Sequence, residues 1–195
     1  MWDQRYAGEA YVYGQTANTF LQQHITDLTG PVLSVAEGEG RNAVFLAQHG
    51  LEVVGVDSSA VGLAKAQRLA KSKKVIITTV QADLAEYQPA VNYFASVVSI
   101  FAHLPSQLRR TLHHRLAKAL RPGGVLLLEG YSKQQLGRGT GGPNNLDMLF
   151  SLDELLQDFP GFKVILGQEI QREVIEGTGH TGLAEVVQLI LQKPK

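Results

Sequence analysis

Short apolar runs recur through the first two thirds of the chain, and most are followed by a turn and then by apolar residues at helical spacing. The runs that predict buried strands are residues 32–36, 53–56, 75–80, 96–100 and 125–129. Alternation of continuous apolar strands with helices is typical of a parallel sheet that is covered by helices on both faces. We therefore expect an α/β fold of the doubly wound kind.

Three helices are predicted between these strands from their apolar faces and their end signals. The first helix has Ala43, Leu46 and Ala47 on one face and ends at Gly50. The second begins after the cap Asp57-Ser58-Ser59 and runs to about Lys71. The third carries Leu108, Leu112 and Leu116 on one face and stops near Pro122-Gly123-Gly124.

The last third of the chain departs from this alternation. A glycine-rich stretch at 137–143 is interpreted as a mobile loop, and the capping sequence 151–154 predicts one more helix. Two strand-like runs, 163–175 and 184–192, are separated only by the turn residues 177–182. With no helix between them, they predict an antiparallel hairpin at the edge of the sheet. No repeat or linker interrupts the chain, so we expect one domain over 1–195.

Composition narrows the class of protein. Of 195 residues, 44% are hydrophobic and 18% are charged, and 18 basic side chains balance 18 acidic ones. A formal charge of zero provides no general attraction to nucleic acid or to an anionic membrane, so neither is an expected partner. The run 125–128 is too short to span a bilayer, and the N-terminus has no apolar signal region. Because the chain has no cysteine, thiolate chemistry is excluded. We expect a cytoplasmic monomer or weak homodimer.

A glycine turn follows the first predicted strand. Its sequence, Gly38-Glu39-Gly40-Arg41-Asn42-Ala43, fits G-x-G-x-x-A, and Asp57 ends the next strand. Glycines let the backbone approach a ligand, and a carboxylate at the second strand accepts hydrogen bonds from ribose hydroxyls. Several nucleoside cofactors share this arrangement, and a tight turn without a ligand would look the same.

Acidic residues at the turn favour one cofactor. A pyrophosphate needs helix N–H groups and positive potential, whereas Glu37 and Glu39 bring negative charge. A cofactor with a sulfonium, an ammonium and no phosphate suits these acids better. Asp83 follows the third predicted strand and is placed to accept a hydrogen bond from an adenine amino group, or to cap a helix.

With these features, the sequence resembles the class I methyltransferases, most closely the tellurite-resistance and thiopurine methyltransferase-like group. The resemblance implies a Rossmann-like, seven-stranded sheet with the last strand antiparallel. It implies an N-terminal lid at 1–30, a cofactor-binding half at 31–131 and an acceptor-side helix and hairpin at 132–195. The segments that carry it are 2–6, 11–14, 36–42, 53–57, 82–84, 99–104 and 120–124.

The same resemblance implies which residues contact S-adenosylmethionine. Gly38 and Gly40 would approach its methionine part, Asp57 would bind the ribose, and residues 82–84 would flank the adenine. The full set of expected cofactor contacts is Arg5, Tyr6, Tyr13, Glu37, Gly38, Gly40, Arg41, Asn42, Asp57, Ser58, Ala82, Asp83, Leu84, Ser99 and Phe101.

The chain also departs from the group's pattern. Ser34 stands where the first strand usually carries an acid, Ala36 replaces the usual first glycine, and Ala95 replaces an acid before the fourth strand. We expect Glu37 to take over the contact to the cofactor's ammonium. If it does not, a cofactor-binding module without catalysis is the alternative.

Two histidines are candidates for the acceptor side. His103 follows the fourth strand and is placed to position or deprotonate an acceptor, or to form hydrogen bonds within a loop. His180 lies in the hairpin turn, where it either reaches over the pocket or is exposed. No spacing suggests a metal site. A soft acceptor such as a thiol or a tellurite-like oxyanion needs no base, whereas a hydroxyl or amine would need one.

A nicotinamide-dependent oxidoreductase is a further alternative. The chain has no Tyr-x-x-x-Lys pair, the turn is acidic and no separate substrate domain is present. These features favour methyl transfer to a small-molecule acceptor.

Overall fold

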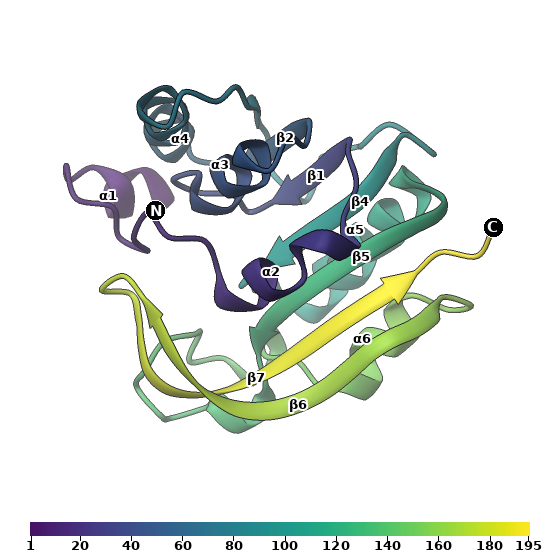
Figure 1. The fold of residues 1–195 in the computed structure, drawn as a ribbon. Helices are drawn as coiled ribbons and strands as arrows, with labels where there is room; N and C mark the ends of the chain where they lie inside the picture. Colours follow the sequence, from purple (N-terminus) through teal and green to yellow (C-terminus); the bar gives the residue numbers. More distant parts are fainter.

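The computed structural model describes residues 1–195, and its seven strands form one sheet in the order β3-β2-β1-β4-β5-β7-β6 (Figure 1). Strands β1 to β5 are parallel, whereas β7 runs antiparallel to both β5 and β6. This arrangement confirms the predicted doubly wound sheet with an antiparallel hairpin at its edge. The strands are β1 Val32–Val35, β2 Val53–Asp57, β3 Thr78–Gln81, β4 Phe94–Ile100, β5 Leu120–Tyr131, β6 Lys163–Glu176 and β7 His180–Gln192.

Six α-helices and three short 3-10 turns connect the strands. The longest helix, α5, has 14 residues, and none of the helices is both long and apolar enough to cross a membrane. The helices are α1 Trp2–Tyr6, α2 Thr19–Gln23, α3 Arg41–Gln48, α4 Ala60–Ser72, α5 Ser106–Ala119 and α6 Leu152–Asp158, and the 3-10 turns are η1 Ile25–Asp27, η2 Lys133–Gln135 and η3 Leu146–Met148.

The sheet separates two apolar cores. Helices α5 and α6 lie behind the sheet in Figure 1, while α2 and α3 lie in front of it. Successive strand residues point to opposite faces, so Val97 packs in the core under α5 and α6 and Val98 packs in the core under α2, α3 and α4. In the same way, Leu126 packs in the core with Val97, and Leu127 packs in the core with Val98. Burial on both faces explains why the central strands are continuously apolar.

The third strand begins three residues later than predicted, at Thr78. Val75 lies in the C-terminal turn of α4, where its N–H donates to the carbonyl of Ala70 and the N–H of Lys74 donates to the carbonyl of Lys71. These two bonds form a Schellman motif, and Lys74 takes the left-handed conformation that the motif requires, with φ 58°. The β-branched run therefore begins as a helix cap, and only its second half is strand.

The fifth strand is longer than predicted because it starts directly after α5, at Leu120. Pro122-Gly123-Gly124, which the sequence indicates as the stop signal of the preceding helix, lies within this strand. Gly123 donates its N–H to the carbonyl of Lys193, so the C-terminal residues pair with this extension.

The strand order reverses between β1 and β4, so their carboxyl ends separate at one point of the sheet edge. Ligands of open α/β sheets bind at such a switch point. Ser59 caps the N-terminus of α4, and Asp3 of α1 accepts hydrogen bonds from its hydroxyl and from the N–H of Val61. The N-terminal segment is thereby held beside the switch point.

We predict that Lys74→Gly raises the free energy of unfolding by up to about 1 kcal/mol, because glycine adopts the left-handed conformation without strain. Urea unfolding measures this change. The matched control is Lys73→Gly, where φ is −91° and glycine should instead cost about 0.5–1 kcal/mol. If both variants lose the same free energy of unfolding, the left-handed conformation assigned to Lys74 would be contradicted.

Candidate active site

A cavity of about 830 Å³ opens at the switch point, which is within the usual size range of cofactor and substrate sites. It is enclosed by the turn after β1, the ends of β2 and β4, the N-terminal segment, the glycine-rich segment and the hairpin turn. The predicted site residues that line it are Arg5, Tyr6, Tyr13, Glu37, Gly38, Arg41, Asn42, Asp57, Ser58, Asp83, Leu84, Phe101, His103 and His180.

Three predicted contact residues, Gly40, Ala82 and Ser99, do not line the cavity. Gly40 caps α3 with φ 93°, and a Cβ atom there would lie 2.5 Å from the Cβ of Ala66 in α4. This glycine therefore permits close packing of two helices. Ser99 lies within β4 and is buried.

Sequence reasoning missed part of the cavity wall. Gly141, Gly142 and Pro143 line it together with Met148. The only signal in the sequence was the glycine-rich composition, which had been interpreted as a mobile loop.

Asp57 and Gly38 form the centre of the cofactor-side wall. The N–H of Gly38 donates to Oδ2 of Asp57 at 2.9 Å, and the N–H of Ser59 donates to Oδ1 at 2.8 Å. Burial raises the pKa of the Asp57 carboxyl, although these N–H groups oppose the effect. A Cβ atom on Gly38 would lie 2.7 Å from the hydroxyl of Tyr6, so glycine is needed for α1 to cover this turn.

Glu37 points beneath the turn and is buried. Its Oε1 accepts the N–H of Ala43 at 2.8 Å, and its Oε2 accepts the hydroxyl of Ser34. Glu37 thus lies against the residue that replaces the usual acid, and it satisfies a free N–H at the start of α3. Burial raises the pKa of Glu37 to about 7.

Glu39 is neutralised by Lys65 of α4, and both side chains are buried. The other oxygen of Glu39 accepts the N–H of Val12 at 2.7 Å, while Lys65 also donates to the carbonyls of Gly8 and Ala10. Glu39 therefore anchors the N-terminal segment. Because Lys65 pairs with Glu39 and burial raises the pKa of Glu37 to about 7, the turn does not carry the two unpaired negative charges on which the sequence argument for the cofactor relied.

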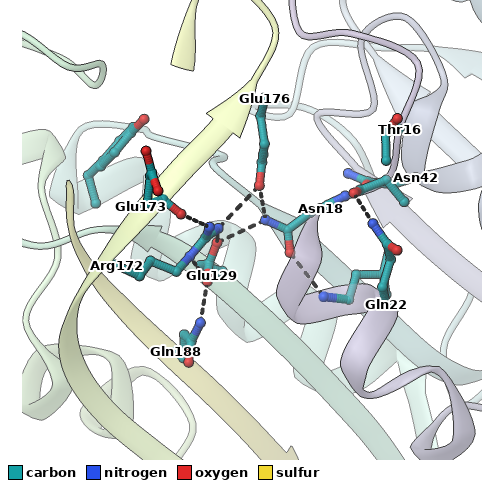
Figure 2. Close-up of polar contacts among 12 residues, drawn as sticks. Thr16, Asn18, Gln22, Asn42, Glu129, Arg172, Glu173, Glu176 and Gln188 are labelled. Carbon is teal, nitrogen blue, oxygen red and sulfur yellow. Dashed lines mark hydrogen bonds and ion pairs between the residues drawn. The ribbon is translucent and has the colours of Figure 1, made fainter. Parts of the chain in front are cut away.

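A buried polar network joins the hairpin to the cofactor turn (Figure 2). Glu129 of β5 accepts hydrogen bonds from Asn18 at 2.8 Å, from Nε of Arg172 at 3.1 Å and from Gln188 at 2.5 Å. Glu176 accepts from Asn18 at 2.8 Å and from Arg172 at 3.1 Å. Its second oxygen pairs with the guanidinium of Arg41 at 2.6 Å. The hairpin, the N-terminal segment and α3 are thereby fixed to one another.

His103 has a structural role. Its Nδ1 lies 2.8 Å from the carbonyl of Met148, and its Nε2 accepts the N–H of Tyr131 at 3.1 Å. These bonds fix a neutral ring with the proton on Nδ1. Burial lowers the pKa of His103 to about 4. With both nitrogens occupied, His103 is not available as the general base that the sequence suggested.

His180 reaches over the cavity rather than standing exposed. Its ring packs 4.5 Å from that of Tyr13 and 4.6 Å from that of Phe101, and it lies among the cavity-lining residues. Its Nδ1 is buried and has no hydrogen-bond partner. Burial lowers the pKa of His180 to about 3, so the ring is neutral.

The structure brings together no group of three histidine, aspartate or glutamate side chains that could hold a metal ion.

Comparison with known protein families identifies part of the chain. Residues 32–124, which run from β1 into β5, match the model of the methyltransferase domain. This part of the chain is therefore similar to a methyltransferase domain. The prediction of an S-adenosylmethionine-dependent methyltransferase is confirmed at this level, and the nicotinamide alternative receives no support. No curated protein matches the chain.

Solved structures share the fold of this methyltransferase domain over nearly the whole chain. A protein studied for the conversion of a disulfide bond into a thioacetal group during echinomycin biosynthesis superposes with a TM-score of 0.78 at 20% identity, covering 99% of this chain and 90% of that one. TehB from Haemophilus influenzae superposes with a TM-score of 0.72 at 17% identity, and the match covers 98% of this chain and 65% of TehB. The N-methyltransferase NodS from Bradyrhizobium japonicum WM9, in complex with S-adenosyl-L-homocysteine, superposes with a TM-score of 0.69 at 14% identity. The match covers 100% of this chain and 99% of NodS.

We predict that Glu37→Gln stabilises the methyltransferase domain at alkaline pH. The unfolded chain releases the Glu37 proton near pH 4.5, whereas the folded chain holds it to about pH 7. Stability from this group is therefore present below pH 4.5 and lost as the pH rises to about 7. Relative to wild type, the variant should gain roughly 1–3 kcal/mol between about pH 5 and about pH 8.

Urea unfolding at several pH values measures this difference. The matched control is Glu86→Gln, because the Glu86 side chain is exposed, and it should follow wild type. A Glu37→Gln curve parallel to wild type would show that Glu37 titrates normally.

Proposed function

We propose that this chain transfers a methyl group from S-adenosylmethionine to a small, soft nucleophile, such as a thiol. The observation that supports this most is the absence of a positioned base on the aromatic side of the cavity. His103 has both nitrogens occupied, and His180 is a very weak base. A hydroxyl or amine acceptor would need a base there, whereas a thiol, with a pKa of about 8.5 for cysteine, is already partly ionised in water at neutral pH.

The cofactor side of the cavity fits a nucleoside without phosphate. Asp57 keeps unused acceptor capacity on each oxygen beyond its two backbone bonds, which suits ribose hydroxyls. Asp83 is exposed at the cavity wall and Leu84 lies beside it, which suits an adenine ring and its amino group. Ser58 and Asn42 complete this side.

The methyl-donor side is aromatic. Phe101 follows β4 and packs against His180, and Tyr13 closes the cavity from the N-terminal segment, where Arg5 donates to its hydroxyl at 2.8 Å. Ring faces attract a sulfonium through their quadrupoles, and they exclude water from the path of the acceptor. S-adenosylmethionine supplies an activated methyl group when bound, so the chain has to position the acceptor in line with it.

With a thiol acceptor, the thiol proton leaves to solvent before the transfer. The bond from the acceptor sulfur to the methyl carbon then forms as the methyl–sulfonium bond breaks, and the electron pair remains on the departing thioether. No residue of the chain has to gain or lose a proton in this step. TehB and NodS share only the fold at these identities, so the site chemistry is the basis for the acceptor.

We predict that Asp57→Ala weakens S-adenosylmethionine binding by roughly 10- to 100-fold, because the ribose loses a charged acceptor. Isothermal titration calorimetry measures the affinity, and a thermal melt verifies that the variant is folded. Asp27→Ala is the control, since Asp27 is exposed and does not line the cavity. Unchanged affinity would remove Asp57 from the cofactor site.

We predict that hydrosulfide, methanethiol and thiophenol are methylated faster than matched amines or alcohols. Formation of S-adenosylhomocysteine measures turnover. For each thiol, kcat/KM should rise with pH to the pKa of that thiol and then stay level, because no enzyme base titrates. Turnover confined to amines or alcohols would contradict the proposal, and no turnover with any acceptor would favour a module that binds the cofactor without catalysis.

A further inference from the structure

Tyr131, the last residue of β5, carries a buried hydroxyl that has no hydrogen-bond partner. The residue is 0% exposed. Buried side-chain hydroxyls in native proteins nearly always have a partner, so an unpaired one requires an explanation. The Nδ1 atom of His180 is the second unpaired buried atom in the same aromatic cluster, and the two rings lie 5.3 Å apart, edge to face.

A thin layer of glycine separates the Tyr131 hydroxyl from the cavity. A Cβ atom on Gly141 would lie 2.3 Å from this hydroxyl, and one on Gly142 would lie 2.8 Å from the Tyr131 ring. Both glycines line the cavity. On its other sides the ring is held by Phe101 at 4.6 Å and by His103 at 5.5 Å. The Tyr131 hydroxyl therefore lies directly under the cavity floor, beside the expected methyl-donor side.

The glycine segment over Tyr131 is held by few contacts. Gln135 donates to the hydroxyl of Thr140 at 2.8 Å and to the carbonyl of Gly141 at 3.1 Å, and Thr140 donates to the carbonyl of Leu183 at 3.0 Å. No side chain at Gly141 or Gly142 fixes the segment in place. These two residues would have to shift for the hydroxyl to meet a ligand in the cavity.

The only cation that acts on the Tyr131 hydroxyl, Arg172, is paired with carboxylates, whereas Arg5 lines the cavity without a carboxylate partner and donates to the Tyr13 hydroxyl. Arg172 is paired with Glu129 and Glu176, Arg41 is paired with Glu176, and the His180 and His103 rings are neutral. Glu129, Glu176 and Arg172 all act on the Tyr131 hydroxyl, and burial with the two carboxylates raises its pKa, so it remains a protonated donor. An oxyanion would find no unpaired positive charge at the Tyr131 hydroxyl itself, whereas a thiol or thiolate accepts a single hydrogen bond from a phenol.

We propose, on the basis of the function proposed above, that the Tyr131 hydroxyl and His180 Nδ1 form the acceptor subsite. In this subsite, Tyr131 donates a hydrogen bond to the acceptor sulfur once Gly141 and Gly142 yield. The subsite selects thiol-type acceptors over oxyanions such as tellurite. Tyr131 is a specificity-determining residue, and it acts on KM for the acceptor rather than on cofactor binding.

The experiment compares Tyr131→Phe with the matched control Tyr87→Phe, because Tyr87 is half-buried and lies outside the cavity. Thiophenol is the acceptor probe, and tellurite is the competing oxyanion. Tyr131→Phe should raise KM for thiophenol about tenfold, change kcat less than KM and leave the calorimetric Kd for S-adenosylmethionine unchanged. Its Tm should be equal to wild type or higher, because an unpaired buried hydroxyl has been removed. Tyr87→Phe should not change KM.

A second measurement does not depend on turnover. Thiophenol is titrated calorimetrically into protein saturated with S-adenosylhomocysteine, and Tyr131→Phe should weaken its binding by the same tenfold. If the wild type binds thiophenol and Tyr131→Phe binds it equally well, this inference is overturned while the proposed function stands. The same follows if tellurite outcompetes thiophenol for the wild type. A fall in Tm without a change in KM would give the hydroxyl a purely structural role and would also overturn it. If the wild type neither binds nor methylates any thiol, the proposed function fails, and the inference fails with it.

Discussion

The structure depends on one buried carboxylate, Glu129, which ends the apolar run of β5 with no exposed surface. A carboxylate in the interior is destabilising by several kcal/mol unless charged and polar partners surround it. The partners come from three separate parts of the chain, namely Asn18 before α2, Arg172 in β6 and Gln188 in β7. The N-terminal segment and the hairpin must therefore both dock before this charge is satisfied.

Glu176 extends this constraint to the cofactor turn. It shares Asn18 and Arg172 with Glu129, and its other oxygen pairs with Arg41 at the start of α3. The wall that carries His180 and the turn that carries Gly38 consequently belong to one rigid unit, although they lie far apart in the sequence. In the proposed reaction, their relative position would determine where an acceptor meets the cofactor.

Local signals in the sequence were sufficient for most of the fold. Continuous apolar runs located the central strands, Ser59 and Ser151 cap helices as their positions indicated, and the absence of a helical pattern after residue 163 identified the hairpin. The errors arose where a distant partner decides the outcome. Val75 was assigned to a strand although it closes a helix cap, and the fifth strand was expected to begin only at Val125 although Gly123 and Gly124 already pair with Lys193.

The candidate site was predictable in outline but not in its charges. Glycine spacing and a strand-end acid placed Gly38 and Asp57 correctly in the cavity. No local pattern shows that Lys65, a helix residue, is buried against Glu39, or that Glu37 binds Ser34. These pairings depend on helix packing, and they change a turn that appears doubly negative into one that is nearly neutral.

Near-neutrality has a consequence for catalysis of the proposed reaction. When a thiolate meets a sulfonium, both charges disappear as the methyl group passes between them. A free cation beside the thiolate would stabilise the separated charges before the transfer more than the transition state, which would slow the step. Holding Arg41 and Arg172 in ion pairs with Glu176 and Glu129 avoids this effect, and it leaves neutral donors and aromatic faces to orient the acceptor. The ion pairs that hold the hairpin in place thereby also remove its charges from the acceptor side of the cavity.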